Sequence, residues 1–222
     1  MSEREGAVTF QGGPLTLVGP ELQVGDQAPD FNVIDGGLGA VTLASSAGKV
    51  RLISAVPSLD TPVCSDQTKR FAEALGGLPE NVEVLTISAD LPFAQGRWCG
   101  AEGVEMTTLS DHRELSFANA YGVLIKELKL LTRAIFVIDA EDKITYVEIV
   151  PEVTDHPDYD AALAAVGAGG GETGKAEADD DDAGDDDDAG GDDFGADLGG
   201  DDAGGGDDAG GDDAGGGDAG DD

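Results

Sequence analysis

Short apolar runs, separated by glycine, proline and charged residues, divide residues 1–175 into alternating candidate strands and helices. Three of these runs are rich in branched aliphatic residues and too short for helices, so they are predicted to be buried strands. They cover residues 50–56, 82–88 and 134–138, and residues 144–150 are expected to pair back on the last of them. Apolar residues at helical spacing predict helices over residues 63–76, 93–99, 114–121 and 158–166.

The N-terminal segment has the two-residue period of strands. Residues 8–10 and 15–18 alternate on either side of Gly12-Gly13-Pro14, which predicts a hairpin, and residues 41–43 predict a further short strand. Strand–helix–strand order, followed by a terminal hairpin and a helix, is typical of an α/β protein. We therefore predict a thioredoxin-like sandwich with an added N-terminal β-hairpin, which occupies residues 7–168 as a single domain.

The composition changes abruptly at Ala176, after which the chain is almost entirely Asp, Gly and Ala. Residues 176–222 carry a charge of −21 from 20 Asp and one Glu, which leaves −14 of the total −35 on residues 1–175. Like charges repel and this segment has almost nothing to bury, so residues 169–222 are expected to be a disordered acidic tail. The acidity of the chain also disfavours binding to nucleic acid or to anionic lipid.

No apolar stretch approaches the roughly 20 residues that cross a bilayer. The polar N-terminal segment 1–6 does not resemble a secretory signal. We therefore expect a cytoplasmic protein with no membrane association. Disulfides in that reducing compartment are usually transient and catalytic, which bears on the two cysteines of the chain.

The first cysteine, Cys64, follows the strand at 50–56 where the chain turns into a helix. Pro57 ends the strand, and Thr61 is a candidate N-cap with Pro62 at the first helical position. Cys64 is therefore expected in the first turn, where unpaired N–H groups and the helix dipole favour a thiolate, the reactive form of cysteine. The alternative interpretation is a buried structural cysteine.

The arrangement Pro-x-x-x-Thr-x-x-Cys, at Pro57, Thr61 and Cys64, resembles that of the peroxiredoxins. Breaking a peroxide O–O bond needs an ionised sulfur, donors that polarise the bond and support for the departing charge. The Thr61 hydroxyl is placed to bond both the sulfur and a peroxide, and Pro57 to limit access of water. Arg133, directly before the apolar run 134–138, is the best candidate for a permanent cation beside the sulfur. Arg133 could instead be a solvated charge at the end of a strand, and Arg51 is the rival candidate for the cation beside the sulfur.

The second cysteine, Cys99, comes 35 positions after Cys64 and lies beside Gly100 in a segment that follows Pro92. With only two Cys and two scattered His, the chain has no zinc signature, and no Cys-x-x-Cys dithiol is present. No metal or other cofactor is therefore expected. The two cysteines could pair with each other after one is oxidised to a sulfenic acid. Two unrelated buried thiols are the alternative.

Beyond these sites, residues 7–166 resemble the thiol peroxidase subfamily of atypical two-cysteine peroxiredoxins. The matching stretches are residues 8–10, 15–19, 24–31, 58–64, 98–103, 109–113, 121–125, 130–134 and 157–163. The acidic tail departs from the subfamily pattern.

The resemblance implies a thiol-specific peroxidase that reduces hydrogen peroxide and organic hydroperoxides. It implies Cys64 as the peroxidatic cysteine, Cys99 as the resolving cysteine of the same chain, and Thr61 and Arg133 as activators. It also implies an intrachain disulfide that is reset by thioredoxin, and a homodimer. By fold analogy, the apolar stretch 121–131 is a candidate dimer surface.

Other classes of function compete with this one. The same disulfide could serve a peroxide-sensing redox switch or a chaperone-like binding protein. An oxidoreductase acting on protein disulfides is disfavoured by the missing Cys-x-x-Cys. A hydrolase triad at Ser110-Asp111-His112 is disfavoured because triad members converge in space and are not sequence neighbours.

Overall fold

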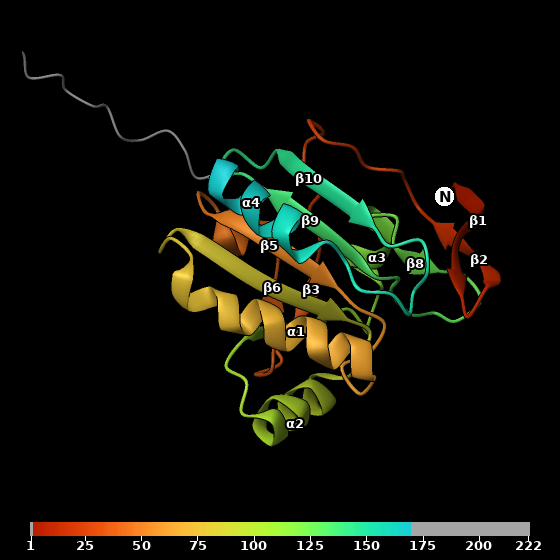
Figure 1. Ribbon diagram of the computed structural model, residues 1–222, viewed down its shortest axis with the longest axis horizontal. Helices are drawn as coiled ribbons and strands as arrows, with labels where there is room; N and C mark the ends of the chain where they lie inside the picture. The colour runs from red at the N-terminus through yellow and green to blue at the C-terminus, as the bar shows by residue number, and fades with distance from the viewer. Residues whose placement is uncertain (1, 170–222) are drawn as a thin grey trace, which may run out of the picture. The chain divides into compact units, whose positions relative to one another are not determined.

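The computed structural model describes residues 2–169, in which helices cover a seven-stranded sheet and a three-stranded sheet stands at one end (Figure 1). The strands are β1 (Glu3–Phe10), β2 (Gly13–Val18), β3 (Val33–Ile34), β4 (Ala40–Val41), β5 (Val50–Ala55), β6 (Val82–Ser88), β7 (Thr107–Ser110), β8 (Leu124–Ile125), β9 (Ala134–Ile138) and β10 (Ile144–Ile149). The helices are α1 (Pro62–Ala74), α2 (Pro92–Glu102), α3 (Ser116–Ala120) and α4 (Tyr159–Gly169), with 3₁₀ turns at Leu43–Ser46 and Leu75–Gly77.

The seven-stranded sheet has the order β10-β9-β5-β6-β7-β3-β4, with β5 parallel to β6 and antiparallel to β9. Every residue of β5 is buried, as expected for a central strand covered on both faces. Leu52 packs in the cluster with Phe71 of α1 and Val166 of α4, while Ile53 packs in the cluster with Phe117 of α3. Helices α1 and α4 thus cover one face and α3 the other (Figure 1), which confirms the predicted thioredoxin-like α/β sandwich.

The N-terminal hairpin is present and pairs through β2 with β8 to form the three-stranded sheet. Its turn lies one residue earlier than predicted: Gln11 and Gly12 have φ of 50° and 77°, and Gly13 already pairs with Phe10. Two successive left-handed residues match the twist of a tight hairpin. Strand β1 begins at Glu3, before the expected domain start at residue 7. The predicted acidic tail, beyond Gly169, lies outside the described residues.

The expected dimer surface at residues 121–131 is wrong for most of its apolar side chains, which belong to the core of the monomer, whereas Leu128 is 43% exposed. Tyr121, Val123 and Leu131 have 0% exposure. The Tyr121 ring stacks on Phe117 with centroids 4.4 Å apart, and Leu124 pairs with Val18 of the hairpin sheet. The segment is apolar because it joins the two sheets.

Three short strands were not predicted, β3, β7 and β8, and Leu43 opens a 3₁₀ turn where a strand was expected. Strand β3 pairs with β7 at a single register position and β8 spans two residues. Runs this short carry too little periodicity to be recognised. Within residues 2–169, no helix has the length and apolar character that a bilayer crossing requires.

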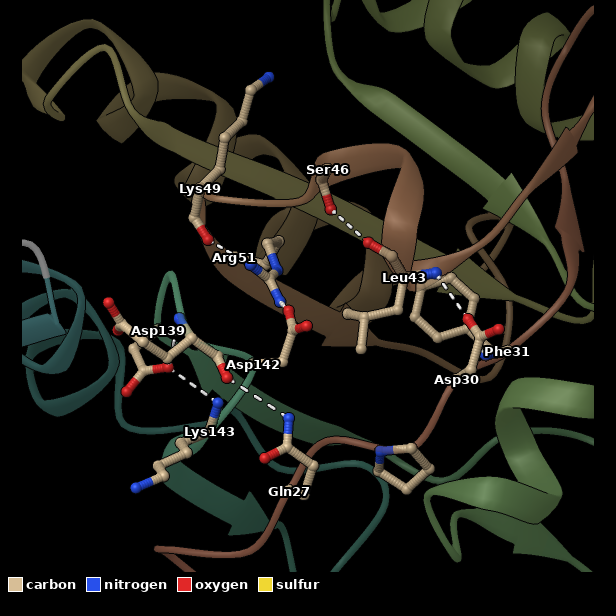
Figure 2. Close-up of polar contacts among 12 residues, drawn as sticks. Gln27, Asp30, Phe31, Leu43, Ser46, Lys49, Arg51, Asp139, Asp142 and Lys143 are labelled. Carbon is tan, nitrogen blue, oxygen red and sulfur yellow. Dashed lines mark hydrogen bonds and ion pairs between the residues drawn. The ribbon is translucent and has the colours of Figure 1, made fainter.

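Arg51, the rival cation, is fully buried near the start of β5, whereas Cys64 follows the end of that strand. Figure 2 shows the Arg51 side chain beside Asp142. Its guanidinium donates to the Lys49 carbonyl and forms an ion pair with Asp142, in the turn between β9 and β10. The same turn binds the segment before β3, because the Ala28 N–H donates to the Asp142 carbonyl at 2.8 Å. Arg51 therefore anchors chain segments at the end of the sheet opposite to the cysteine.

Candidate active site

Cys64 lies in the first turn of α1, where the sequence predicts it. Thr61 has the extended backbone of an N-cap and Pro62 occupies the first helical position. The Ser65 N–H donates to the Thr61 carbonyl at 2.9 Å and begins the helix. The Thr61 hydroxyl, expected at the sulfur, donates to the Ser58 carbonyl at 2.9 Å in this structure. Cys64 itself has 0% exposure.

Arg133, at the residue before β9, points its guanidinium at this sulfur. Its Nη2 donates to Cys64 Sγ at 3.4 Å, and its Nε and Nη2 donate to the Val153 carbonyl at 3.1 and 3.0 Å. Arg133 is 2% exposed, and in the described part of the chain it forms no ion pair with a carboxylate. A buried cation needs an anion, and a Cys64 thiolate would supply one at hydrogen-bond distance.

Gln67 is a site residue that the sequence reasoning missed. It lies three residues after Cys64, on the same face of α1, and has 0% exposure. Its Oε1 accepts from Arg133 Nη1 at 2.5 Å, and its Nε2 donates to Ser54 Oγ at 2.7 Å. Gln67 therefore links the guanidinium to the central strand. The sequence contains one indication of this role, an amide side chain three residues after the cysteine and therefore on the same face of the helix.

A cavity of about 290 Å³ opens beside the guanidinium. Its walls are mostly apolar and come from the hairpin, the start of α1 and the loop after β10. The lining residues are Phe10, Pro57, Thr61, Pro62, Val63, Arg133, Val153 and Thr154. Pro57 and Thr61 thus stand at the cavity with Arg133, while the Cys64 sulfur is buried next to the guanidinium.

Cys99 lies in α2, which continues to Glu102, beyond the predicted end at residue 99. It is partly exposed, its Sγ is 3.9 Å from Thr108 Oγ1, and both cysteines are free thiols. Cys99 packs against the small apolar cluster that contains Cys64 and Trp98. The structure therefore brings both free cysteines to one cluster.

Two exposed ion pairs join α2 to the α1 region. Arg97 Nη2 is 2.7 Å from Asp60 Oδ1, and Lys69 Nζ is 2.5 Å from Glu102 Oε2. Each pair has one partner on α2 and the other on α1 or the loop before it. They hold the helix that carries Cys99 against the segment that carries Cys64.

A network of polar side chains, which was not predicted from the sequence, binds both cysteine-bearing segments to the end of β6. The Asp90 carboxylate accepts from the Leu59 N–H and from the Ser88 hydroxyl, each at 2.8 Å. Ser88 Oγ in turn accepts from Gln95 Nε2 of α2 at 2.9 Å. The loop before Cys64 and the helix of Cys99 are thus tied to one strand end.

Ser110, Asp111 and His112 do not form a triad. Ser110 Oγ is 2.8 Å from His112 Nδ1, but the Asp111 carboxylate accepts from the N–H groups of Phe117 and Ala118 at 3.2 and 2.8 Å. Burial raises the pKa of Asp111 to about 6. Its carboxylate binds the start of α3, and within residues 2–169 His112 forms no ion pair with a carboxylate.

Replacing Arg133 with alanine is expected to slow the reactions of Cys64, because the change removes the buried cation that donates a hydrogen bond to the sulfur. Loss of a charged donor of this kind typically reduces rates by roughly a hundredfold. The measurement is the rate of Cys64 alkylation by iodoacetamide against pH, together with the rate of peroxide reduction. Arg97→Ala, on an exposed arginine, is the matched control. A titration identical to that of the parent would remove Arg133 from the site.

A cysteine at the start of a helix, beside a buried arginine on a thioredoxin-like sheet, defines a thiol-dependent redox enzyme. The Redoxin family model matches residues 23–163. Thiol peroxidase of Halalkalibacterium halodurans is 58% identical over 163 residues, covering 73% of this chain and 98% of that protein. Thiol peroxidase of Bacillus subtilis is 55% identical over 162 residues, covering 72% and 96%. A peroxiredoxin-like protein from Aquifex aeolicus superposes with a TM-score of 0.69 at 43% identity, covering 74% of this chain and 97% of that one.

The chain belongs to the thiol peroxidases of the redoxin family and is a peroxidase. The peroxiredoxin resemblance drawn from the sequence is therefore confirmed.

Proposed function

We propose that this peroxidase reduces hydrogen peroxide and organic hydroperoxides at Cys64. The Cys64 thiolate attacks one peroxide oxygen and the O–O bond breaks. The other oxygen leaves as hydroxide or alkoxide and takes a proton from solvent to give water or an alcohol. The sulfur becomes a sulfenic acid, two electrons more oxidised than the thiolate. The observation that carries this proposal is the 3.4 Å contact from Arg133 Nη2 to the buried Cys64 sulfur. Arg133 also lines the pocket, and the other seven lining residues are uncharged.

The residues around Cys64 have distinct roles in this proposal. Arg133 stabilises the thiolate and then the negative charge on the departing oxygen. The Thr61 hydroxyl lies at the pocket and binds the peroxide after it turns away from the Ser58 carbonyl. Pro57, which is buried at the pocket wall, limits access of water.

Cys99 completes the cycle as the resolving cysteine. Its thiol condenses with the Cys64 sulfenic acid to give a disulfide and one water molecule. Thioredoxin then reduces the disulfide by thiol–disulfide exchange and returns both thiols. The shared apolar cluster supports this step, and local unfolding of α2 or of the start of α1 would bring the sulfurs together.

The cellular setting belongs to the same proposal. A disulfide that is broken and re-formed in each cycle suits the reducing cytoplasm. The homodimer implied by the subfamily resemblance is also proposed, although its surface is not the apolar side chains of residues 121–131, which are mostly buried. Size-exclusion chromatography with light scattering measures the oligomeric state directly.

The test is an assay in which thioredoxin, thioredoxin reductase and NADPH are coupled to peroxide consumption. Hydrogen peroxide and cumene hydroperoxide are compared at equal concentrations. The proposal predicts many turnovers per chain with thioredoxin as the reductant. A redox switch or chaperone-like protein would instead oxidise once per chain and recycle poorly, so a single stoichiometric burst contradicts the proposal.

Deleting residues 176–222 is expected to leave turnover unchanged, because Cys64, Cys99, Thr61, Arg133 and Pro57 all lie within residues 2–169. Solubility should fall, since the deletion removes 21 of the negative charges of the chain. The measurements are kcat/KM in the coupled assay and the protein concentration at which precipitation begins. A changed kcat/KM would show that the acidic segment takes part in catalysis.

A further inference from the structure

Glu152, in the loop between β10 and α4, binds the turn of the N-terminal hairpin with its carboxylate. Oε1 accepts from the Gln11 N–H at 3.0 Å, and Oε2 accepts from the Gly12 N–H at 3.1 Å and the Thr9 hydroxyl at 2.8 Å. Oε1 also accepts from the N–H and hydroxyl of Thr154, at 3.2 and 2.8 Å. Donors from two segments more than 140 residues apart in sequence thus converge on one side chain.

The backbone around Glu152 extends this contact to the active site. The Thr9 N–H donates to the Pro151 carbonyl at 2.7 Å, and the Val153 N–H donates to the Thr9 carbonyl at 2.8 Å. The Val153 carbonyl is the group that accepts two hydrogen bonds from Arg133. The hairpin, the 151–154 loop and the guanidinium are therefore connected in series, ending at the Cys64 sulfur.

The same two segments build one wall of the active-site pocket. Phe10 comes from the hairpin, and Val153 and Thr154 come from the loop. Phe10 is 43% exposed, so little besides the hairpin itself holds this ring in place. A hairpin detached from the loop would widen the pocket and free the Val153 carbonyl to turn.

We propose that Glu152 is a positioning residue for peroxide reduction: its carboxylate fixes the hairpin turn to the 151–154 loop, aims the Val153 carbonyl at Arg133 and keeps Phe10 over the pocket. The proposal rests on the proposed roles of Cys64 and Arg133. The Gly12 N–H and the Thr9 hydroxyl lower the pKa of Glu152 to about 2. The carboxylate therefore keeps its charge throughout the range in which the enzyme is assayed.

Glu152→Gln is the direct test, because the amide retains one acceptor and turns an NH₂ group toward backbone and hydroxyl donors. The matched control is Glu127→Gln. Glu127 also binds the hairpin backbone, through the Thr16 N–H at 3.0 and 3.2 Å, but it does not line the pocket or touch the 151–154 loop. Both changes are made in full-length chains that carry Cys99→Ser, so that one thiol reacts.

Two rates are measured well below the unfolding temperature: alkylation of Cys64 by iodoacetamide, and oxidation by hydrogen peroxide followed through the fluorescence of Trp98, the single tryptophan. Glu152→Gln is expected to slow both by roughly three- to tenfold, the effect of losing part of a charge-assisted hydrogen-bond network. Glu127→Gln should retain the parental rates. Alkylation uses no peroxide, so it decides the role of Glu152 even if the parent fails to turn over peroxide.

Parental rates in Glu152→Gln overturn the proposal, whether or not the melting temperature falls. Equal slowing in both variants also overturns it, because the effect would then come from general loosening of the hairpin. If Glu152→Gln does not fold, the proposal is tested with Thr9→Val. This change removes the hydroxyl that donates to Glu152 and keeps the shape and strand preference of threonine. A slowing of about twofold in that variant supports the proposal, and an unchanged rate overturns it.

Discussion

Cys64→Ser is expected to abolish peroxide turnover. Serine has nearly the shape of cysteine, so α1 should form as before, but its hydroxyl does not ionise near neutral pH and cannot be oxidised to a sulfenic acid. The Arg133 guanidinium would then face a neutral oxygen. The measurement is peroxide consumption in the coupled thioredoxin assay, in which no rate above that of buffer is expected.

Circular dichroism and thermal unfolding provide the control for this change, since the variant must fold like the parent. Ser65→Ala, at the next position of the same helix, is a matched substitution that should keep full turnover because Ser65 forms no side-chain hydrogen bond in the described part of the chain. Full activity in Cys64→Ser would mean that the reacting atom lies elsewhere and that the assignment of the pocket is wrong.

Cys99→Ser is expected to separate the two halves of the cycle. The first half should survive, because Cys64, its contacts with Arg133 and Gln67, and the pocket beside Arg133 are untouched. Each chain should consume about one equivalent of peroxide and stop, since thioredoxin acts on disulfides and the variant cannot form one within the chain. Single-turnover stopped-flow gives the stoichiometry, and trapping with dimedone followed by mass spectrometry identifies the sulfenic acid on Cys64.

The parent chain under the same conditions should yield a Cys64–Cys99 disulfide and little trapped sulfenic acid. Continuous turnover of Cys99→Ser with thioredoxin would contradict the resolving role, because it would show that the reductant reaches the Cys64 sulfenic acid directly. Thr108→Val, which removes the hydroxyl near Cys99 Sγ, is a milder change at the same place and should preserve turnover.

Much of the fold was predictable because the central strands are long and apolar. The runs at 82–88 and 134–138 coincide with β6 and β9, and the start of α1 follows from Thr61 and Pro62. Neighbouring residues in the sequence are enough to predict such elements. The position of Arg133 directly before a buried strand also predicted that it lies near Cys64. The 3.4 Å distance from its Nη2 to the sulfur is known only from the tertiary structure.

What the sequence did not predict depends on contacts between distant segments. Gln67, Asp90 and Glu152 are ordinary polar residues until the fold places Arg133, Leu59 and the hairpin turn against them. The segment 121–131 misled for a related reason. Its apolar character is equally consistent with an interface and with a core, and the structure buries most of its apolar side chains in the core, where β8 pairs with β2.

The two ion pairs that join α2 to the α1 region have a consequence for the medium in which the enzyme works. Both lie at the surface, with side-chain exposures of 37–64%, where dissolved ions screen charges over about 8 Å at physiological ionic strength. Added salt weakens such contacts and leaves the buried guanidinium–sulfur contact largely unaffected. In the proposed cycle, added salt should therefore speed formation of the Cys64–Cys99 disulfide and leave the rate of the preceding oxidation of Cys64 nearly unchanged.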